Sequence, residues 1–328
     1  MRFSHHFLMS VSKKILVLSS LLALGAGMSA SAAPRINGAG ASFPAKIYQR
    51  WFADLARSGG PQVNYQSVGS GSGRKAFIDQ TVNFAASDDP MKKKDMAKVG
   101  RGVVQIPMVG GTIAFGFNKP GCDLKLSQKQ AVRVAMGKVK NWKELGCKPG
   151  TLVWVHRSDG SGTTKAFTNS MEAFSSLWTL GTGKSVKWPA GVGAKGNSGV
   201  AGVIQNRVGA IGYLNYGYVV GDKFQQAAIQ NKAGNYVKAN GETSAAGLAQ
   251  IVLDDKLRGT DANPAGANAF PIVSLTWILA EPGHKTGAVK SALRYMLSEE
   301  AQGVSDSLGY VPLPESLRQK SLAAVNSL

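Results

Sequence analysis

The sequence predicts an α/β fold with mostly parallel sheets, on three observations. Short apolar runs of strand length alternate with amphipathic stretches of helix length. Glycine-rich turns that contain serine or threonine repeatedly connect a strand to a following helix. The 328 residues suffice for two domains, yet no repeat of solenoid period and no Pro/Ser-rich linker divides them. We therefore expect two α/β domains between which the chain crosses more than once.

The N-terminus has the layout of a secretory signal peptide, predicted over residues 1–33. Basic residues within the first fourteen positions precede an uncharged stretch at 15–34, whose middle, ILVLSSLLALGAG, is apolar. An Ala-x-Ala pattern at 30–32 follows. The run is short for a membrane anchor, and its second half consists of small residues. We expect cleavage near Ala32 or Ala33 and a soluble protein outside the cytoplasmic membrane.

The first elements of the mature chain follow from periodicity and turn residues. The stretch AKIYQRWFADLARSG, from Ala45, carries its large apolar residues on one face and ends at Gly-Gly-Pro, which predicts a helix. VNYQSV (63–68) has the composition of a strand. A Gly-Ser repeat then leads into a short helix over 74–82. NFAASD (83–88) predicts a short strand that ends at an Asp-Asp-Pro turn.

The later elements are richer in strand-forming residues. Most residues in these stretches are apolar, and many of them are β-branched or aromatic, as is typical of buried strands. The expected strands are 102–118, broken at Pro107, then 152–156, 209–219 and 270–280, and a helix is expected from Gly287 to Leu297.

Composition and charge narrow the classes of function without choosing one. A hydrophobic content of 44% excludes a wholly disordered chain. The formal net charge of +19 favours anionic ligands or surfaces. It does not discriminate among nucleic acid, acidic lipid, cell-wall polymer and small anions. The densest basic run, Lys92–Lys94, is short, so basic charge spread over the surface stays an alternative.

The two cysteines fit an oxidising compartment. Cys122 and Cys147 lie 25 residues apart and can close a single disulfide loop, which would contribute about 3 kcal/mol in a chain-entropy model. Two reduced thiols are the alternative. Two cysteines without a neighbouring histidine are too few to make a metal site.

Three glycine-rich loops share one plan. They span Gly38–Pro44, Gly69–Gly73 and Asp159–Thr164, and each combines glycine with Ser or Thr ahead of a helix. A helix N-terminus offers unpaired N–H groups and the positive end of the helix dipole, glycine permits close approach, and hydroxyls donate further hydrogen bonds. Each loop by itself is also typical of a turn with a helix cap. Three in one chain favour an anion site at the carboxyl ends of strands.

Motifs for competing chemistry are absent or weak. There is no phosphate-binding G-x-x-x-x-G-K-[ST] loop, no G-x-S-x-G elbow and no H-E-x-x-H sequence. Gly71-x-Gly73-x-x-Ala76 and Gly191-x-Gly193-x-x-Gly196 match a dinucleotide fingerprint only loosely. The mature chain has two histidines, His156 and His284, which leaves a Ser-His-Asp triad through His156 open and gives little for a zinc site.

Two charged positions complete the predicted site. Arg157, at the end of the strand LVWVH, is suited to bidentate contact with an oxyanion, and Asp159 can hold its guanidinium in place. A plain surface pair is the alternative. Asp88 ends its strand, and because a carboxylate only accepts, it favours an anion that carries a proton. It would admit hydrogen or dihydrogen phosphate and reject sulfate. Its alternative role, or that of Asp89, is a helix cap.

The chain resembles the periplasmic phosphate-binding proteins of high-affinity phosphate ABC importers. The matching stretches are GAGASFP, VNYQSVGSGSG, FAASDDP, RSDGSGTT, KWPAGVGAKGNSGVAG and GAIGYLNY, in the family's order. The resemblance implies a two-lobed binding protein of type II, with two crossover strands and the ligand in the cleft. Lobe 1 would comprise 34–109 and 272–328, and lobe 2 would comprise 110–271.

The resemblance also implies the ligand contacts and the partners. It implies inorganic phosphate as ligand, permease membrane subunits as partners, a periplasmic location and a monomer without cofactor, metal, enzyme activity or nucleic-acid partner. The alternatives are a phosphate-ester hydrolase using Ser161 or Ser70, another oxyanion-binding protein, or a basic scaffold for polyanions. Ser42 stands where many relatives have Thr, and Asp159 where the family keeps an acid that pairs with the arginine. The implied phosphate contacts are Ser42, Phe43, Ser70, Asp88, Arg157, Ser161, Gly162 and Thr163.

Overall fold

The structure is a computed structural model that describes residues 33–221, 224–283 and 287–328. The predicted signal peptide lies outside these residues except for its last position, and His284 lies outside them as well. No helix within the described ranges is long and apolar enough to cross a membrane.

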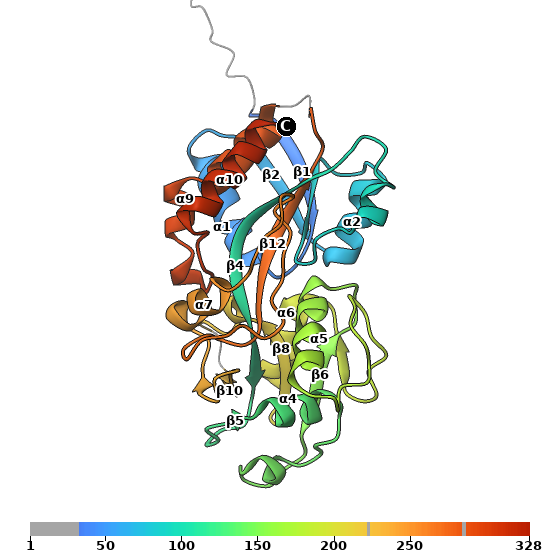
Figure 1. Cartoon of the computed structure of the whole chain (residues 1–328), viewed down its shortest axis with the longest axis vertical. Coiled ribbons are helices and arrows are strands. Elements are labelled where there is room, and N and C mark those ends of the chain that lie inside the picture. Colours follow the sequence, from blue (N-terminus) through green and yellow to red (C-terminus); the bar gives the residue numbers. More distant parts are fainter. Residues whose placement is uncertain (1–32, 222–223, 284–286) are drawn as a thin grey trace, which may run out of the picture. The chain divides into compact units, whose positions relative to one another are not determined.

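One large sheet forms the centre of the fold (Figure 1), in the strand order β2-β1-β3-β12-β4-β8-β6-β7, with β9 paired to β4. Strand β1 pairs in parallel with β2 and β3, and β6 pairs in parallel with β7 and β8. The bounds are β1 Arg35–Gly40, β2 Gln62–Ser67, β3 Phe84–Ser87, β4 Val104–Phe117, β6 Val153–Arg157, β7 Val192–Ala194, β8 Ala210–Asn215, β9 Gln225–Gln226 and β12 Val273–Ala280.

The two central strands connect the two halves of the sheet. Strand β4 pairs antiparallel with β12 over 104–112 and antiparallel with β8 over 113–117. The expectation of mostly parallel pairing therefore holds for the two flanks and is wrong for the centre. We call β1, β2, β3 and β12 the first half, and β6, β7, β8 and β9 the second. The lobe boundaries 34–109 with 272–328, and 110–271, stay predictions.

The expected break at Pro107 does not occur. Strand β4 runs through this residue, and the pairing register with β12 shifts between Thr276 and Trp277, the latter opposite Pro107. A bulge accommodates a residue that has no N–H to donate, so the strand continues.

Ten helices are described, and most of them cover the faces of this sheet. In helix α1, Ile47, Trp51 and Leu55 are buried, as the periodicity predicts. Helix α2 begins at Ser70, so the Gly-Ser repeat forms its first turn, whereas the sequence suggests a loop there. The bounds are α1 Ala45–Arg57, α2 Ser70–Ile78, α3 Lys93–Met96, α4 Gln128–Ala135, α5 Gly162–Phe174, α6 Gly196–Asn206, α7 Gly241–Leu248, α8 Gly287–Met296, α9 Glu299–Gly303 and α10 Glu315–Asn326.

The sequence does not predict strand β1, because half of its residues are glycine or alanine, which have low β-propensity. A Cβ on Gly38 would lie 2.2 Å from the ring of Phe84, on the neighbouring strand β3. The small side chains of β1 thus make room for Phe84, and pairing on both edges stabilises a strand of low β-propensity. Strand β1 ends just before Ser42, so this pairing positions the first loop of the candidate site.

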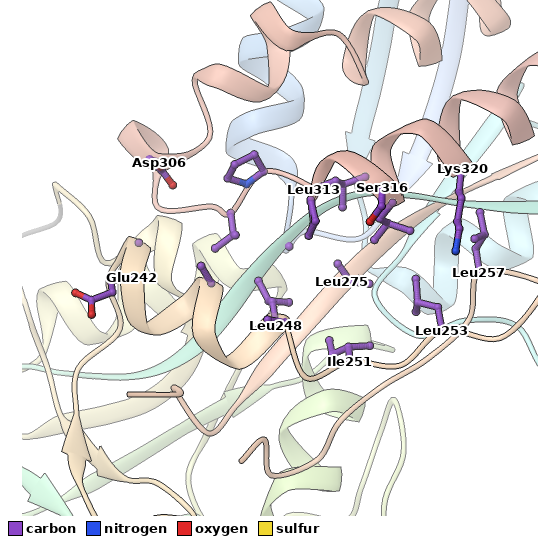
Figure 2. Close-up of a pocket in the computed structure, with 18 of the residues that line it drawn as sticks. Glu242, Leu248, Ile251, Leu253, Leu257, Leu275, Asp306, Leu313, Ser316 and Lys320 are labelled. Carbon is purple, nitrogen blue, oxygen red and sulfur yellow. The ribbon is translucent and has the colours of Figure 1, made fainter. Parts of the chain in front are cut away.

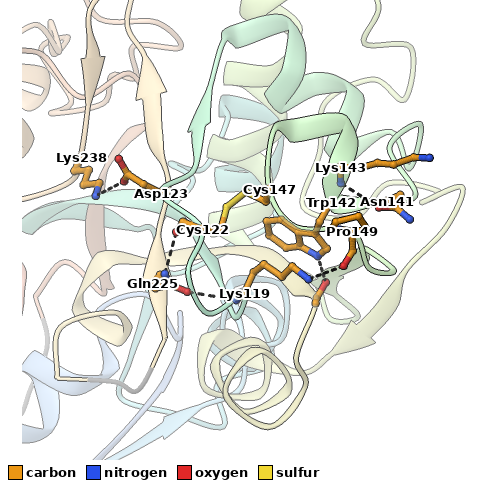
Figure 3. The surroundings of a disulfide bond; sticks show 11 residues. Lys119, Cys122, Asp123, Asn141, Trp142, Lys143, Cys147, Pro149, Gln225 and Lys238 are labelled. Carbon is orange, nitrogen blue, oxygen red and sulfur yellow. Dashed lines mark hydrogen bonds and ion pairs between the residues drawn. A yellow bond between two sulfur atoms is a disulfide. The ribbon is translucent and has the colours of Figure 1, made fainter.

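The disulfide between Cys122 and Cys147 is present, with a Cα–Cα distance of 5.4 Å (Figure 3). It encloses α4 and the 3-10 helix Trp142–Leu145. Trp142 donates its indole N–H to the Gly209 carbonyl at 3.0 Å, which ties this loop to the start of β8. A small sheet of β5 (Lys125–Leu126), β10 (Ala228–Gln230) and β11 (Tyr236–Val237) lies in this part of the second half.

Candidate anion-binding site

The candidate site lies at the carboxyl ends of parallel strands, where open α/β sheets bind ligands. Strands β1, β2 and β3 of the first half end just before four of the predicted residues. Strand β6 ends at Arg157, as predicted, and leads into the N-terminus of α5. The residues that follow these strands are Ser42 and Phe43, Ser70, Asp88, and then Arg157 to Thr163.

Asp88 is a buried carboxyl with an unfilled oxygen. Its residue is 2% exposed, and Oδ2 accepts a long hydrogen bond of 3.4 Å from the Thr163 hydroxyl, which belongs to the second half. Oδ1 has no hydrogen-bond partner among the described residues, and the Thr276 hydroxyl, which also has none there, approaches this carboxyl without bonding to Oδ1. The backbone N–H of Asp88 donates to Ser70 Oγ at 3.3 Å. Burial raises the pKa of Asp88 to about 7, although a Thr276 hydroxyl contact, Arg157 and Thr163 act to lower it.

Arg157 is a buried cation with one free donor. Asp159 accepts from its Nε at 2.7 Å and its Nη2 at 2.5 Å, while Nη1 is buried and has no partner among the described residues. Burial acts to raise the pKa of Asp159, but Arg157 outweighs it and the pKa lies below the ordinary value. With a side chain only 1% exposed, Arg157 forms a buried pair with Asp159 and not the surface pair considered as its alternative.

The N-terminus of α5 supplies further donors. Ser161 caps this helix by accepting from the Thr164 N–H at 3.0 Å, and its own hydroxyl proton stays available. The N–H groups of Gly162 and Thr163 are in the first turn, where a helix provides no acceptor. The capping role and the anion-site role of this loop are therefore compatible.

The two halves of the sheet meet at this helix end. The Gly71 N–H donates to the Gly160 carbonyl at 2.8 Å, which joins the second and third glycine loops. Gly162 lies so near the first half that a Cβ there would be 2.6 Å from Ser70 Oγ and 2.8 Å from Asp88 Cβ. The structure thus brings the predicted residues of both halves into one buried cluster.

Phe43 contributes through its backbone. Its ring is buried edge-on against Tyr310, with centroids 6.3 Å apart, and its carbonyl accepts from the Tyr310 hydroxyl at 2.8 Å. The Ser42 carbonyl in turn accepts from the Tyr218 hydroxyl at 2.7 Å. These bonds fix the loop before α1, so the group of Phe43 that remains for an anion is its N–H.

The sequence reading missed Asn197, in the first turn of α6. This fully buried residue donates from its backbone N and from Nδ2 to Ser42 Oγ, at 3.0 and 2.9 Å, and from Nδ2 to Thr163 Oγ1 at 3.1 Å. Strand β7 has only three residues, so the Gly-Asn-Ser-Gly turn after it is not recognised as a strand-to-helix loop. This turn resembles the other three glycine-rich loops, and that resemblance is the signal from which Asn197 could have been predicted.

His156, the histidine considered for a Ser-His-Asp triad, contacts an aromatic ring and a backbone carbonyl. The ring of His156 stacks on Trp188, with centroids 5.1 Å apart, and its Nδ1 contacts the Arg157 carbonyl at 3.1 Å. Burial lowers the pKa of His156. In the described part of the chain, no group of three or more His, Cys, Asp or Glu residues could hold a metal ion.

A cavity of about 780 Å³ lies elsewhere and shares no residue with the site (Figure 2). Leu248, Ile251 and Leu313 are among its apolar lining residues, and Glu242, Asp306 and Lys320 lie on its rim. None of these three charged residues is buried. A ligand site needs a few polar groups that point toward one place. The cluster around Asp88 provides such groups and this cavity does not, so we take the cluster as the candidate site.

Fold and site together define a two-lobed α/β binding protein of the periplasmic type II class. A family model described as PBP superfamily domain matches residues 27–300. The phosphate-binding protein PstS of Pasteurella multocida is 37% identical over 309 residues, 88% of this chain and 89% of that protein. PstS of Haemophilus influenzae is 36% identical, over 85% of this chain and 89% of its own. The chain therefore belongs to the PBP superfamily and, within it, to the PstS family of phosphate-binding proteins.

Solved structures agree with the fold. A periplasmic phosphate-binding protein called PfluDING, with bound phosphate, superposes with a TM-score of 0.74 at 21% identity, over 88% of this chain and 93% of that one. A phosphate ABC transporter substrate-binding protein from Clostridium perfringens gives a TM-score of 0.66 at 19% identity, over 85% of this chain and all of that one. At these identities the likeness concerns the fold alone.

Proposed function

We propose that the protein binds inorganic phosphate outside the cytoplasmic membrane and delivers it to the membrane subunits of an ABC importer. The names of the relatives support this ligand, and the buried cluster of donors with one carboxyl supports a protonated anion. In this proposal the protein is periplasmic, monomeric and not an enzyme, and it uses neither a metal nor a cofactor. Nucleic acid is not its partner.

One observation carries the choice of phosphate. Asp88 and Arg157 are both buried, and each has one polar atom, Oδ1 and Nη1, without a partner among the described residues. Buried polar atoms without partners are costly, so the pair indicates a ligand that both accepts and donates. Phosphate at neutral pH has unprotonated oxygens for the guanidinium and a P–OH group for the carboxylate. Sulfate has no proton to donate.

The remaining contacts would come from hydroxyls and helix N-termini of both halves. Donors from both halves would surround the phosphate, so that release requires the halves to separate in a hinge motion. The residues proposed to bind phosphate are Ser42, Phe43, Ser70, Asp88, Arg157, Ser161, Gly162 and Thr163, with Asp159 holding the guanidinium of Arg157.

Isothermal titration calorimetry of phosphate-free protein tests this proposal. At about pH 9, where Asp88 is a carboxylate, we expect one tight site for phosphate and much weaker binding of sulfate. Arg157→Ala should weaken phosphate binding by about a hundredfold or more, since it removes a buried charged donor. Arg207→Ala, which removes the same charge from an exposed position, is the matched control and should change affinity less than about twofold. Absence of phosphate binding, or equal affinity for sulfate, contradicts the proposal.

The hydrolase alternative has a separate test. The protein, freed of metal, is incubated with p-nitrophenyl phosphate, and phosphate release is followed over many turnovers. We expect none, because the ring of His156 is held against Trp188 and its Nδ1 against the Arg157 carbonyl. Sustained turnover that is lost in Ser161→Ala or Ser70→Ala would favour the enzyme.

A further inference from the structure

Asn197 connects hydroxyl groups that come from the two halves of the site. Ser42 belongs to the loop after β1, and Thr163 to the first turn of α5. The Asn197 side chain donates to both of them, at 2.9 and 3.1 Å. All three residues are buried, so these bonds do not compete with solvent.

The orientation of the Asn197 amide is determined by a neighbour that can only donate. The backbone N–H of Asn215, at the end of β8, points at Asn197 Oδ1 with a distance of 2.8 Å. An N–H group requires an acceptor, so the oxygen of the amide must face Asn215. The NH₂ group must then face Ser42 and Thr163, where it acts as a donor.

This orientation determines what the two hydroxyls can do. Ser42 Oγ accepts from both the backbone N and the Nδ2 of Asn197, which fills its two acceptor positions. Only its own proton remains, so Ser42 can act toward a ligand only as a donor. Thr163 Oγ1 also accepts from Asn197, and its own proton is directed toward Asp88 Oδ2 at 3.4 Å, so this hydroxyl is held between the two residues.

We propose that Asn197 is a specificity-determining positioning residue that makes the Ser42 hydroxyl a donor to the anion and holds the Thr163 hydroxyl against Asp88. A free hydroxyl could accept a proton from P–OH and let phosphate bind in several orientations. With the Ser42 hydroxyl committed as a donor, the anion oxygen that it contacts must be unprotonated, and the P–OH group is directed to Asp88. This inference rests on the proposed function, with phosphate as the ligand. Asn197 itself does not contact phosphate and acts only by positioning Ser42 and Thr163.

A double-mutant cycle tests the role of Asn197 by calorimetry with inorganic phosphate. Asn197→Ala in the natural chain should weaken phosphate binding by about ten- to a hundredfold. In a chain that already carries Ser42→Ala and Thr163→Val, the same substitution should cost less than about threefold, because the hydroxyls through which it acts are gone. Phosphorus NMR extends the measurement to millimolar dissociation constants.

Asn118→Ala is the matched control. Asn118 also donates from Nδ2 to two oxygens, the Ile204 and Gln205 carbonyls, at the opposite end of the same helix α6. It should leave phosphate affinity within about twofold, while thermal unfolding monitors the stability of every variant. An equal loss from Asn197→Ala in both backgrounds, or no loss in the natural chain, overturns the inference. If the natural chain itself does not bind phosphate, the proposed function fails, which is a distinct result.

Discussion

Two opposing effects act on the pKa of Asp88. Burial raises this pKa, and the positive charge of the nearby Arg157 lowers it. Burial dominates and raises the pKa of this carboxyl to about 7, well above its ordinary value. Below this pH Asp88 is neutral and can donate a hydrogen bond; above it Asp88 is a carboxylate that only accepts. The same side chain should therefore treat protonated and fully ionised anions differently on the two sides of neutrality.

Sulfate affinity should consequently depend steeply on pH. Sulfate has no proton, so it requires a protonated Asp88, and its dissociation constant should rise about tenfold per pH unit above about 7 and level off below it. Phosphate keeps a proton as HPO₄²⁻ through this range and should show a much weaker dependence. Calorimetric titrations with each anion between about pH 5.5 and 9 measure both slopes.

Asp88→Asn checks that this residue is the origin of the pH dependence. An amide can donate at any pH, so the sulfate slope should vanish, and sulfate should bind about tenfold more tightly at pH 8 than it binds to the natural chain. Asp255→Asn, at an exposed acid that forms no ion pair within the described ranges, should preserve the slope. A sulfate slope that persists in Asp88→Asn would assign the titration to another group.

At the scale of elements, the N-terminus of α5 lies against the first half of the sheet. Gly162 is the contact point, because a Cβ there would come within 3 Å of Ser70 Oγ, Asp88 Cβ and the Asp88 backbone N. These neighbours include backbone, which cannot swing aside as a long side chain can. A single methyl group at this position would keep the two halves from meeting.

Gly162→Ala should therefore lower phosphate affinity by about tenfold or more without unfolding either half. The Cβ obstructs only the approach of α5 to Ser70 and Asp88, while alanine is a good residue within a helix. Gly202→Ala, in α6, is the control, since its Cβ would meet no atom within 4 Å. Calorimetry gives the affinities and thermal unfolding gives the stabilities. Equal phosphate affinities in the two variants would show that α5 does not need this close approach.

The elements that the sequence predicted well are those whose signals are local. The apolar face of α1, the strand that ends at Arg157 and the turn at Asp88 follow from periodicity and from glycine and proline positions. Most predicted site residues lie just after such strands, so the sequence could indicate a common edge. The structure then assembled them in one cluster.

The features that the sequence could not predict depend on contacts distant along the chain. Strand β1 is stabilised by its two neighbours and by Phe84 above Gly38, and Pro107 stays within β4 because of a bulge against β12. Asn197 acquires its role from Ser42, 155 residues away. No local pattern contains this information, so propensity and periodicity overlook it.

At the scale of the whole molecule, basic side chains gather beside the site. Arg74 and Lys184 approach Asp89, the residue after Asp88, at 3.0 and 3.7 Å. A shallow cavity next to Asp89 is lined by Lys92 and Lys165, among others. Four basic side chains, Arg74, Lys184, Lys92 and Lys165, thus lie around Asp89, beside the buried anion site. Such a field accelerates the encounter with an anion more than it strengthens the bound state.

Phosphate association should therefore slow as salt is added, while dissociation should not change. In stopped-flow fluorescence, raising NaCl from about 0.02 to about 0.5 M should lower the association rate constant by roughly tenfold, and the dissociation rate constant should stay within about twofold. Lys92→Gln with Lys165→Gln should reduce the association rate at low salt, because both side chains border Asp89. Lys138→Gln with Lys148→Gln removes the same charge from exposed positions in the region of the disulfide and should reduce it less. If both double variants reduce the association rate equally, the net charge of the whole molecule acts on phosphate and not the charge beside Asp89. If added salt does not lower the association rate constant, the basic surface does not guide phosphate to the site.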